Sequence, residues 1–231
     1  MYRHYVFDLY GTLADIRTDE EDPAVWRSLA EHAGISVSAD LKDTYAALCR
    51  EMEKRKSAEL AALGIPGPAE IDILKVWERL FPAADPLEIS RLFRRLTTRK
   101  LALYPSARQV LQALRKQGHT VTLLSNAQES FTLPELKRLG LETCFDHIFL
   151  SSRYGFRKPS PAFFGLLPQA GMDPADCLMI GNDDVCDCRG AAESGMDSLY
   201  IRTEQSPPLS GPLPRRCRQI TSLRDIPEKE L

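Results

Sequence analysis

Four short segments of the chain, each placed after an apolar run, carry side chains suited to catalysis. The first is DLYGT at residues 8–12, and the second is Ser125 with Asn126. The third is Lys158, followed at once by a proline, and the fourth is the acidic stretch NDDVCD at residues 182–187. A carboxylate, a hydroxyl and an ammonium at successive strand ends can line one ligand site, and a group of acids needs a cation or solvent to screen its charge.

The first segment predicts an anion-binding turn at the mouth of a ligand site. In an open parallel sheet, ligands bind beyond the carboxyl ends of the strands, so Asp8 would stand at the mouth of a site. Gly11 lets the chain turn sharply, and the N–H groups after it can then face an anion. An aspartate before a Gly-Thr pair also caps ordinary turns, so this segment alone leaves both interpretations open.

The acidic stretch predicts a metal site. Its three carboxylates, Asp183, Asp184 and Asp187, repel one another unless a cation or solvent screens them. Oxygen-rich clusters of this kind suit Mg²⁺. The two cysteines at 186 and 188 have no second Cys or His pair at a matching spacing, which disfavours zinc.

Apolar runs and helical patterns alternate along much of the chain, and this alternation predicts an α/β fold. Strands are expected at 5–7, 120–124, 147–150, 178–180 and 198–201, with a short one around 219–220. Helices are expected at 106–116, 134–139, 161–171 and 187–195. Such alternation with short loops predicts right-handed βαβ units and a parallel sheet covered on both faces.

Residues 17–100 break that alternation. They hold no convincing strand, and helical patterns run over 41–63, 71–81 and 87–101. The last of these carries five cations that are typical of a solvated helix face: Arg91, Arg94, Arg95, Arg99 and Lys100. We therefore expect a core domain of residues 1–16 and 101–231, with a helical domain of residues 17–100 inserted after the first strand.

Composition narrows the functional class. The chain of 231 residues has a net charge of −2, which argues against a nucleic-acid partner. It has no run of 18 apolar residues, so no membrane span is expected. Its six cysteines are scattered over a long chain, which favours free thiols and a cytoplasmic location.

The four segments, in this order, resemble the haloacid dehalogenase-like hydrolase superfamily. The resemblance covers nearly the whole chain and includes Gly190-Ala191 and Gly195-Met196 after the acidic stretch. It implies an α/β, Rossmann-like parallel core with a mobile helical cap. It also implies covalent catalysis through the aspartate that matches Asp8.

The resemblance implies a role for each matching residue. Asp8 would attack, and Lys158, Mg²⁺ and the backbone N–H groups after Tyr10 would offset the negative charge. Ser125 and Thr12 would hydrogen-bond phosphate oxygens or hold Asp8 in line. The catalytic set is then Asp8, Tyr10, Ser125 and Lys158, and the substrate-binding set is Gly11, Thr12 and Asn126. The metal ligands would be Asp8, the Tyr10 carbonyl and the acidic stretch, through Asn182, Asp183 and Asp187.

Two departures from the family pattern point in opposite directions. Phosphatases of the family carry a second aspartate two positions after the nucleophile, but Tyr10 stands there, as in the 2-haloacid dehalogenase branch. A phenol with a pKa near 10 can donate a proton at pH 7 but is a poor base. That branch, however, works without metal and places an aspartate at Val185 and a tyrosine at Phe164. The acidic stretch matches the metal-dependent members better, with Asn182 replacing the first aspartate.

The sequence therefore predicts a Mg²⁺-dependent phosphatase that acts on a small phosphorylated metabolite through an aspartyl-phosphate intermediate. One alternative is a metal-independent 2-haloacid dehalogenase, whose halide leaves without needing a proton. The other is a regulatory or binding protein that kept the fold and lost efficient turnover, since Tyr10 and Asn182 both weaken the catalytic set. Residual metal-dependent hydrolysis, or halide release without metal, would distinguish the three.

Overall fold

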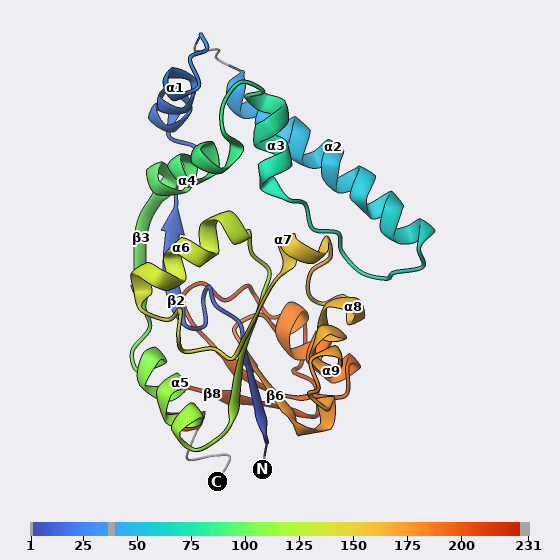
Figure 1. The fold of residues 1–231 in the computed structure, drawn as a ribbon. Coiled ribbons are helices and arrows are strands. Elements are labelled where there is room, and N and C mark those ends of the chain that lie inside the picture. The colour runs from blue at the N-terminus through green and yellow to red at the C-terminus, as the bar shows by residue number, and fades with distance from the viewer. Residues whose placement is uncertain (1, 37–39, 227–231) are drawn as a thin grey trace.

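A six-stranded parallel sheet lies at the centre of the computed structural model, which describes residues 2–36 and 40–226 (Figure 1). Its strand order is β5-β4-β1-β6-β7-β8. The strands are β1 (His4–Phe7), β4 (Thr120–Ser125), β5 (His147–Leu150), β6 (Cys177–Gly181), β7 (Asp197–Ile201) and β8 (Cys217–Ile220). The chain runs outward from β1 through β4 and β5 and then returns to β6 on the other side of β1. This reversal places a ligand crevice beside β1, and it confirms the predicted Rossmann-like α/β fold.

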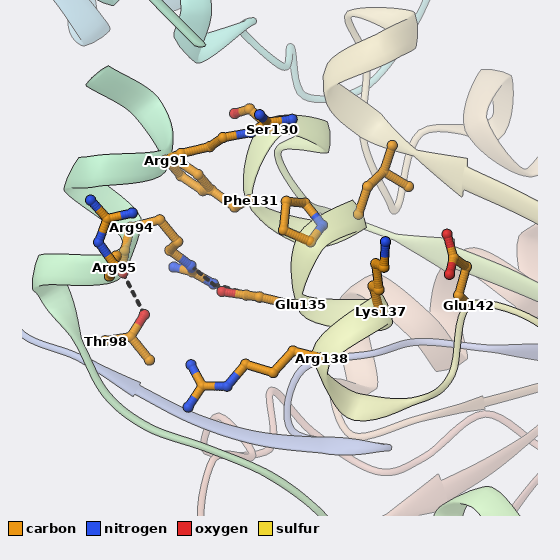
Figure 2. A pocket seen from close by; sticks show the side chains of 12 residues that line it. Arg91, Arg94, Arg95, Thr98, Ser130, Phe131, Glu135, Lys137, Arg138 and Glu142 are labelled. Carbon is orange, nitrogen blue, oxygen red and sulfur yellow. Dashed lines mark hydrogen bonds and ion pairs between the residues drawn. The ribbon is translucent and has the colours of Figure 1, made fainter. Parts of the chain in front are cut away.

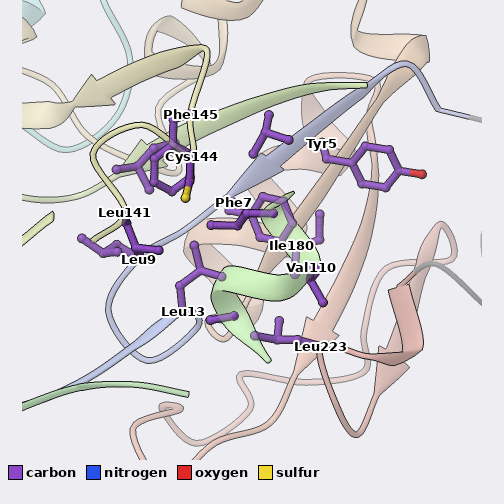
Figure 3. Close-up of a cluster of buried hydrophobic side chains, with 14 of the residues drawn as sticks. Tyr5, Phe7, Leu9, Leu13, Val110, Leu141, Cys144, Phe145, Ile180 and Leu223 are labelled. Atoms are coloured by element: carbon purple, nitrogen blue, oxygen red, sulfur yellow. The ribbon is translucent and has the colours of Figure 1, made fainter. Parts of the chain in front are cut away.

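Helices cover both faces of this sheet. They are α5 (Ala107–Lys116), α6 (Glu129–Leu139), α7 (Ser151–Tyr154), α8 (Pro161–Phe164), α9 (Leu166–Gln169) and α10 (Gly190–Glu193), with two irregular turns, η1 (Pro174–Asp176) and η2 (Asp184–Arg189). Side chains alternate along β1, so Tyr5 and Phe7 pack in a cluster with residues of α5 and α6 (Figure 3). Val6 packs on the opposite face with residues of α8 and α9. Each face of β1 is therefore buried, which fixes the strand that ends at Asp8.

A helical insertion follows β1. The chain leaves the core through β2 (Ala14–Thr18) and returns through β3 (Thr98–Leu103), and these strands form a separate antiparallel pair. Between them lie α1 (Pro23–His32), α2 (Leu41–Ala62), α3 (Ile73–Leu80) and α4 (Pro86–Thr97). These helices share a buried cluster that includes Trp26, Trp77 and Phe93. The insertion stands above the sheet edge in Figure 1, on the side away from both termini.

The paired strands β2 and β3 correct the expectation that residues 17–100 hold no strand. The helix expected over 87–101 ends at Thr97, where its hydroxyl bonds the Phe93 carbonyl. Arg99 and Lys100 consequently lie on β3 and not on a helix face, with Lys100 paired to Asp15 of β2. The pattern misled because a two-stranded ribbon is exposed along much of its length and lacks the alternation of a half-buried strand.

Three expected helices also have different bounds. Helix α6 begins at Glu129, so Pro134 lies inside it and not at its first position. The helix expected over 161–171 is divided into α8 and α9, since Pro168 has no N–H to donate to the preceding turn. The segment expected as one helix from 187 to 195 is divided between η2 and α10. The short strand expected near residue 219 is confirmed as β8.

No helix within the described ranges has the length and apolar character needed to cross a bilayer. All six cysteines lie among the described residues and are free thiols.

Candidate active site

The carboxyl ends of the three central strands bring the predicted catalytic residues together. Asp8 follows β1, and its backbone N–H donates to the Ile180 carbonyl of β6 at 3.0 Å. Ser125 ends β4, and its hydroxyl donates to Asp8 Oδ1 at 3.1 Å. The Lys158 ammonium donates to the same oxygen at 2.8 Å. These two donors fix one oxygen of Asp8, whereas Oδ2 has, among the described residues, one weak contact with the Thr12 hydroxyl at 3.4 Å.

A cavity of about 200 Å³ opens over this carboxylate. Its walls are Asp8, Tyr10, Ser125, Asn126, Lys158, Asn182, Asp183, Cys186, Asp187, Gln205 and Pro207. We call it the Asp8 cavity. All residues predicted for catalysis and metal binding lie on it, although they come from segments up to 179 residues apart in the sequence.

Lys158 lies fully buried between two carboxylates. Its Nζ is 2.6 Å from Asp187 Oδ1 as well as 2.8 Å from Asp8. Burial alone would lower the pKa of this ammonium, but Asp187 and Asp8 outweigh burial and hold the pKa above its ordinary value. Burial also raises the pKa of Asp187, against the opposing effect of Lys158. Two carboxylates therefore depend on one cation, and the site holds more negative than positive charge.

Asn126 lines the cavity, and both ends of its side-chain amide bind the Lys158 backbone. Its amide oxygen accepts from the Lys158 backbone N–H at 2.8 Å, and its amide nitrogen donates to the Lys158 carbonyl at 3.1 Å. Both ends of the amide are thus used in fixing the lysine backbone. Asn126 therefore positions Lys158, and the substrate contact predicted for it from the sequence stays a prediction.

Two glycines allow the acidic stretch to fold back over the strand ends. A Cβ on Gly181 would lie 2.1 Å from Asp187 Oδ2, so only glycine lets that carboxylate approach. Gly11 has a φ of +82°, and a Cβ there would lie 2.3 Å from the Asn182 amide. Gly11 therefore makes room for Asn182, whose Oδ1 accepts from the Thr12 hydroxyl at 3.2 Å. Gly11, which was predicted to bind substrate, thus permits the close approach of the loop after β1 to the acidic stretch.

The acids of the stretch have separate tasks. Asp183 Oδ1 accepts from the N–H groups of Val185 and Cys186, both at 2.8 Å, and so begins the turn η2. Asp184 turns away from the cavity to Arg189 and Ser210. Asp187 is therefore the carboxylate of the stretch that shares the Lys158 ammonium with Asp8.

Tyr10 lines the cavity, but its hydroxyl is turned to α6. The hydroxyl donates to Glu135 and lies 3.0 Å from the Thr132 hydroxyl. Glu135 in turn accepts from Arg94 Nε at 2.6 Å. Burial and Glu135 raise the pKa of Tyr10 above its ordinary value. The phenol is therefore protonated at neutral pH and already donates its proton to a carboxylate.

We expect Tyr10→Phe to lower kcat by less than about tenfold, because a general acid in this position would contribute about 10²–10⁴. Glu135 would lose a donor, so the free energy of unfolding should fall by about 1–3 kcal/mol. Steady-state kinetics and urea unfolding of the variant measure the two effects. A loss of kcat above a hundredfold with unchanged stability would show that the hydroxyl takes part in chemistry.

The oxygen atoms on the wall of the Asp8 cavity suit the coordination that Mg²⁺ commonly has in proteins. The described residues contain no group of three or more acids, His or Cys that converge on one metal position. Mg²⁺ commonly uses one or two protein carboxylates together with water and substrate phosphate. Asp8 and the acidic stretch offer such carboxylates, and no described residue donates a hydrogen bond to the Tyr10 carbonyl. The residues present therefore fit this ion.

Sequence reasoning missed several residues that shape the site. Arg94 and Glu135, which hold the Tyr10 hydroxyl, come from helices with no motif. Gln205 lines the cavity and donates to Asp15, and it follows the carboxyl end of β7. The sequence analysis could have found Gln205 by examining the residues after the strand expected at 198–201, as it did for the four segments after other apolar runs. Glu70 lines an adjoining cavity of about 310 Å³ that shares Tyr10 and Asn126 with the first.

A parallel sheet with a fixed carboxylate, a buried ammonium and an acidic loop at one edge is an arrangement suited to hydrolysis by an α/β enzyme. The model of the haloacid dehalogenase-like hydrolase family matches residues 2–195. The chain belongs to this family, which confirms the resemblance inferred from the four segments.

Named relatives include phosphatases. A phosphoglycolate phosphatase from Agrobacterium fabrum is 28% identical over 197 residues, 85% of this chain and 78% of the relative. A ribulose-1,5-bisphosphate 5-phosphatase from Halopiger xanaduensis is 29% identical over 125 residues, 53% of this chain and 52% of the relative. The chain spans about half the length of the first curated relatives that it matches.

The fold is also that of a dehalogenase. The crystal structure of a 2-haloacid dehalogenase from Pseudomonas syringae has a TM-score of 0.64 with 21% identity, and the alignment covers 99% of this chain and 97% of that one. At this identity the likeness establishes the fold alone. The choice between phosphatase and dehalogenase therefore depends on the side chains of the site.

Proposed function

We propose that this enzyme is a Mg²⁺-dependent phosphatase that hydrolyses a small phosphorylated metabolite. The observation that carries the proposal is the Asp8 carboxylate, fixed on one oxygen by Ser125 and Lys158 and facing a cavity that the acidic stretch also lines. An oxygen-rich wall suits a cation that accompanies phosphate, whereas halide displacement has no use for it.

In the proposed reaction, Asp8 Oδ2 bonds to phosphorus while the bond from phosphorus to the leaving oxygen breaks. Water then adds to phosphorus while the bond from phosphorus to the Asp8 oxygen breaks, which restores the carboxylate and releases phosphate carrying both protons of the water. Lys158 and the N–H groups after Tyr10 offset charge on the phosphoryl oxygens. Asp8, the Tyr10 carbonyl and the acidic stretch, through Asn182, Asp183 and Asp187, would hold Mg²⁺, which supplies further positive charge there.

The helical insertion serves as a cap in this proposal, with residues 17–100 as a domain that rests on the core of residues 1–16 and 101–231. Its α4 already contacts α6 through Arg94 with Glu135 and through Ser90 with Ser130 at 2.7 Å. A cap in this position would exclude water and select the substrate. The free thiols fit the cytoplasmic location that we propose for the enzyme.

A substrate screen tests this function. We expect phosphate release from phosphorylated metabolites with Mg²⁺, and a loss of at least about a hundredfold with EDTA, because the ion would offset much of the charge on the phosphoryl group. A parallel panel of 2-haloacids is scored for free halide. Halide release that EDTA does not affect would replace the phosphatase with the dehalogenase. No turnover in either panel would favour a binding role.

The dehalogenase remains the second candidate because of one observation. The Tyr10 hydroxyl is bound to Glu135, so no acid stands two positions after the nucleophile. A halide needs no proton when it leaves, so a site without a general acid at position 10 could catalyse its displacement.

The same observation predicts a strong dependence on the leaving group if phosphate is the substrate. Each acid on the described wall of the Asp8 cavity is already engaged: Asp8 attacks, Asp183 begins a turn and Asp187 binds Lys158. Leaving groups that depart unprotonated should therefore be favoured. We expect kcat/KM for p-nitrophenyl phosphate to exceed that for a simple alkyl phosphate by about 10²-fold or more, the usual contribution of a general acid.

A series of aryl and alkyl phosphates with graded leaving-group pKa measures this dependence. Equal kcat/KM across the series would mean that another residue supplies the proton. Tyr10→Asp provides the matched comparison, because it introduces the acid of the phosphatase pattern and should raise turnover of the alkyl substrates selectively.

A further inference from the structure

A second and larger cavity lies where α4 of the insertion meets α6 of the core (Figure 2). Its volume is about 550 Å³, within the range of small-molecule sites. It shares no lining residue with the Asp8 cavity. We call it the α4–α6 groove.

The wall of this groove is strongly cationic, although the chain has a net charge of −2. Two carboxylates, Glu135 and Glu142, lie on it together with five cations: Arg91, Arg94, Arg95, Lys137 and Arg138. Arg94 is paired with Glu135. Among the described residues, no carboxylate lies within ion-pair distance of any of the other four cations. An anion in the groove would find positive charge that the protein has not already used.

Arg95, Lys137 and Arg138 lie in the last turns of α4 and α6, where positive charge suits the helix dipole, but the dipole does not account for Arg91 or for the grouping of the four cations on one groove. Arg91 and Arg95 are four residues apart on α4, so they lie on one face of the helix, and like charges at this spacing destabilise a helix. Lys137 and Arg138 add further positive charge from α6 (Figure 2). A bound anion would turn this repulsion into attraction.

The floor of the groove is apolar and contains an aromatic ring. Phe131, Leu133 and Pro134 line it, and the Arg94 guanidinium lies 5.0 Å from the centre of the Phe131 ring. Guanidinium groups stack on aromatic faces and also bind phosphate with two parallel hydrogen bonds. The groove therefore offers contacts for a flat ring and for phosphate groups at the same time.

We propose that the α4–α6 groove binds a nucleoside polyphosphate, with the base on the apolar floor and the phosphates on the unpaired cations. Two residues of this groove, Arg94 and Glu135, hold the Tyr10 hydroxyl, but none lines the Asp8 cavity, so the proposed binding does not require the phosphatase function. The occupant of the groove would contact both the insertion and the core.

Calorimetric titration of the full chain with ATP in EDTA tests this proposal. We expect ATP to bind at least fivefold more tightly than inorganic tripolyphosphate, and adenosine to bind least. Arg91→Gln with Arg95→Gln should weaken ATP binding at least tenfold. The matched control is Arg50→Gln with Lys54→Gln, an exposed pair with the same spacing on α2 and outside the groove, which should change ATP binding less than twofold.

Thermal unfolding shows whether each variant is folded, and the groove variant should be at least as stable as the wild type because a repulsion is removed. Equal ATP affinity in the groove variant and the wild type would place ATP elsewhere and overturn the proposal. Tripolyphosphate binding as tightly as ATP would overturn the role of the apolar floor. Absence of ATP binding, with a dimer that dissociates in the groove variant, would assign the groove to a second copy of the chain.

Discussion

Asp8→Asn should lower kcat by at least about 10³-fold, the scale of loss seen when a covalent nucleophile is removed. An amide keeps the size of the side chain and one oxygen that can accept from Ser125 and Lys158. It cannot form the covalent bond, because its lone pairs are far less nucleophilic than those of a carboxylate. The loss should therefore appear without a loss of folding. Steady-state kinetics with an aryl phosphate and Mg²⁺ gives the ratio.

Mass spectrometry of the wild type, quenched in acid during turnover, should show a phosphoryl group on the peptide that contains residue 8. Ser125→Ala is the matched control, since it removes one donor to Asp8 Oδ1 but leaves the nucleophile in place. It should retain the labelled peptide and a larger fraction of kcat. Activity of Asp8→Asn within tenfold of the wild type would rule out covalent catalysis by this residue.

Lys158→Met should inactivate the enzyme and also destabilise it. Removing the buried ammonium leaves the carboxylates of Asp8 and Asp187 without their shared counter-charge. Breaking a buried ion pair from one side costs about 3–5 kcal/mol. For a chain of this size, that corresponds to a fall of roughly 10 °C in the unfolding temperature.

The destabilisation of Lys158→Met should depend on pH in a defined direction. Without the ammonium, burial and the repulsion from Asp8 raise the pKa of Asp187 in the folded state above its unfolded value. The folded variant then binds more protons than its unfolded chain, so its stability is greatest in acid and falls as the pH rises through the raised pKa. The difference in unfolding temperature from the wild type should be smaller at pH 5 than at pH 8.

Thermal unfolding at the two pH values measures this difference. Adding Asp187→Asn to Lys158→Met should recover part of the stability at pH 8 but none of the activity, because one of the uncompensated charges is removed. A difference from the wild type that is the same at both pH values would show that lost packing, and not lost charge, destabilises the variant.

The sequence predicted the central sheet well because its strands are short apolar runs bounded by turns and helices. The same rule failed for β2 and β3, whose exposed ribbon has charged residues such as Arg17 and Lys100 where a core strand would have apolar ones. The rules for helix starts also placed Pro134 at the first position of its helix, whereas the helix begins five residues earlier, at Glu129.

The sequence predicted which residues line the candidate site, but it predicted only some of their contacts. Parallel strands that end at one edge bring Asp8, Ser125 and Asn182 together, and the position of each could be inferred from its strand. The partners of Tyr10 could not, because Arg94 and Glu135 lie on helices whose relative rotation depends on tertiary packing. The hydrogen bonds from Asn126 to the Lys158 backbone were likewise not predictable, because they depend on how the segment between β5 and β6 packs against the end of β4.

The antiparallel pairing of β2 with β3 has a consequence for how the two parts of the chain are joined. Thr18 and Thr98 are partners in this ribbon, so the outgoing and returning chains stand side by side at the top of the core. A tight reverse turn could link these two positions without lengthening any connection below them. The ribbon therefore closes the insertion at its base, so that the chain connections of the catalytic edge do not depend on the length of the segment between 18 and 98.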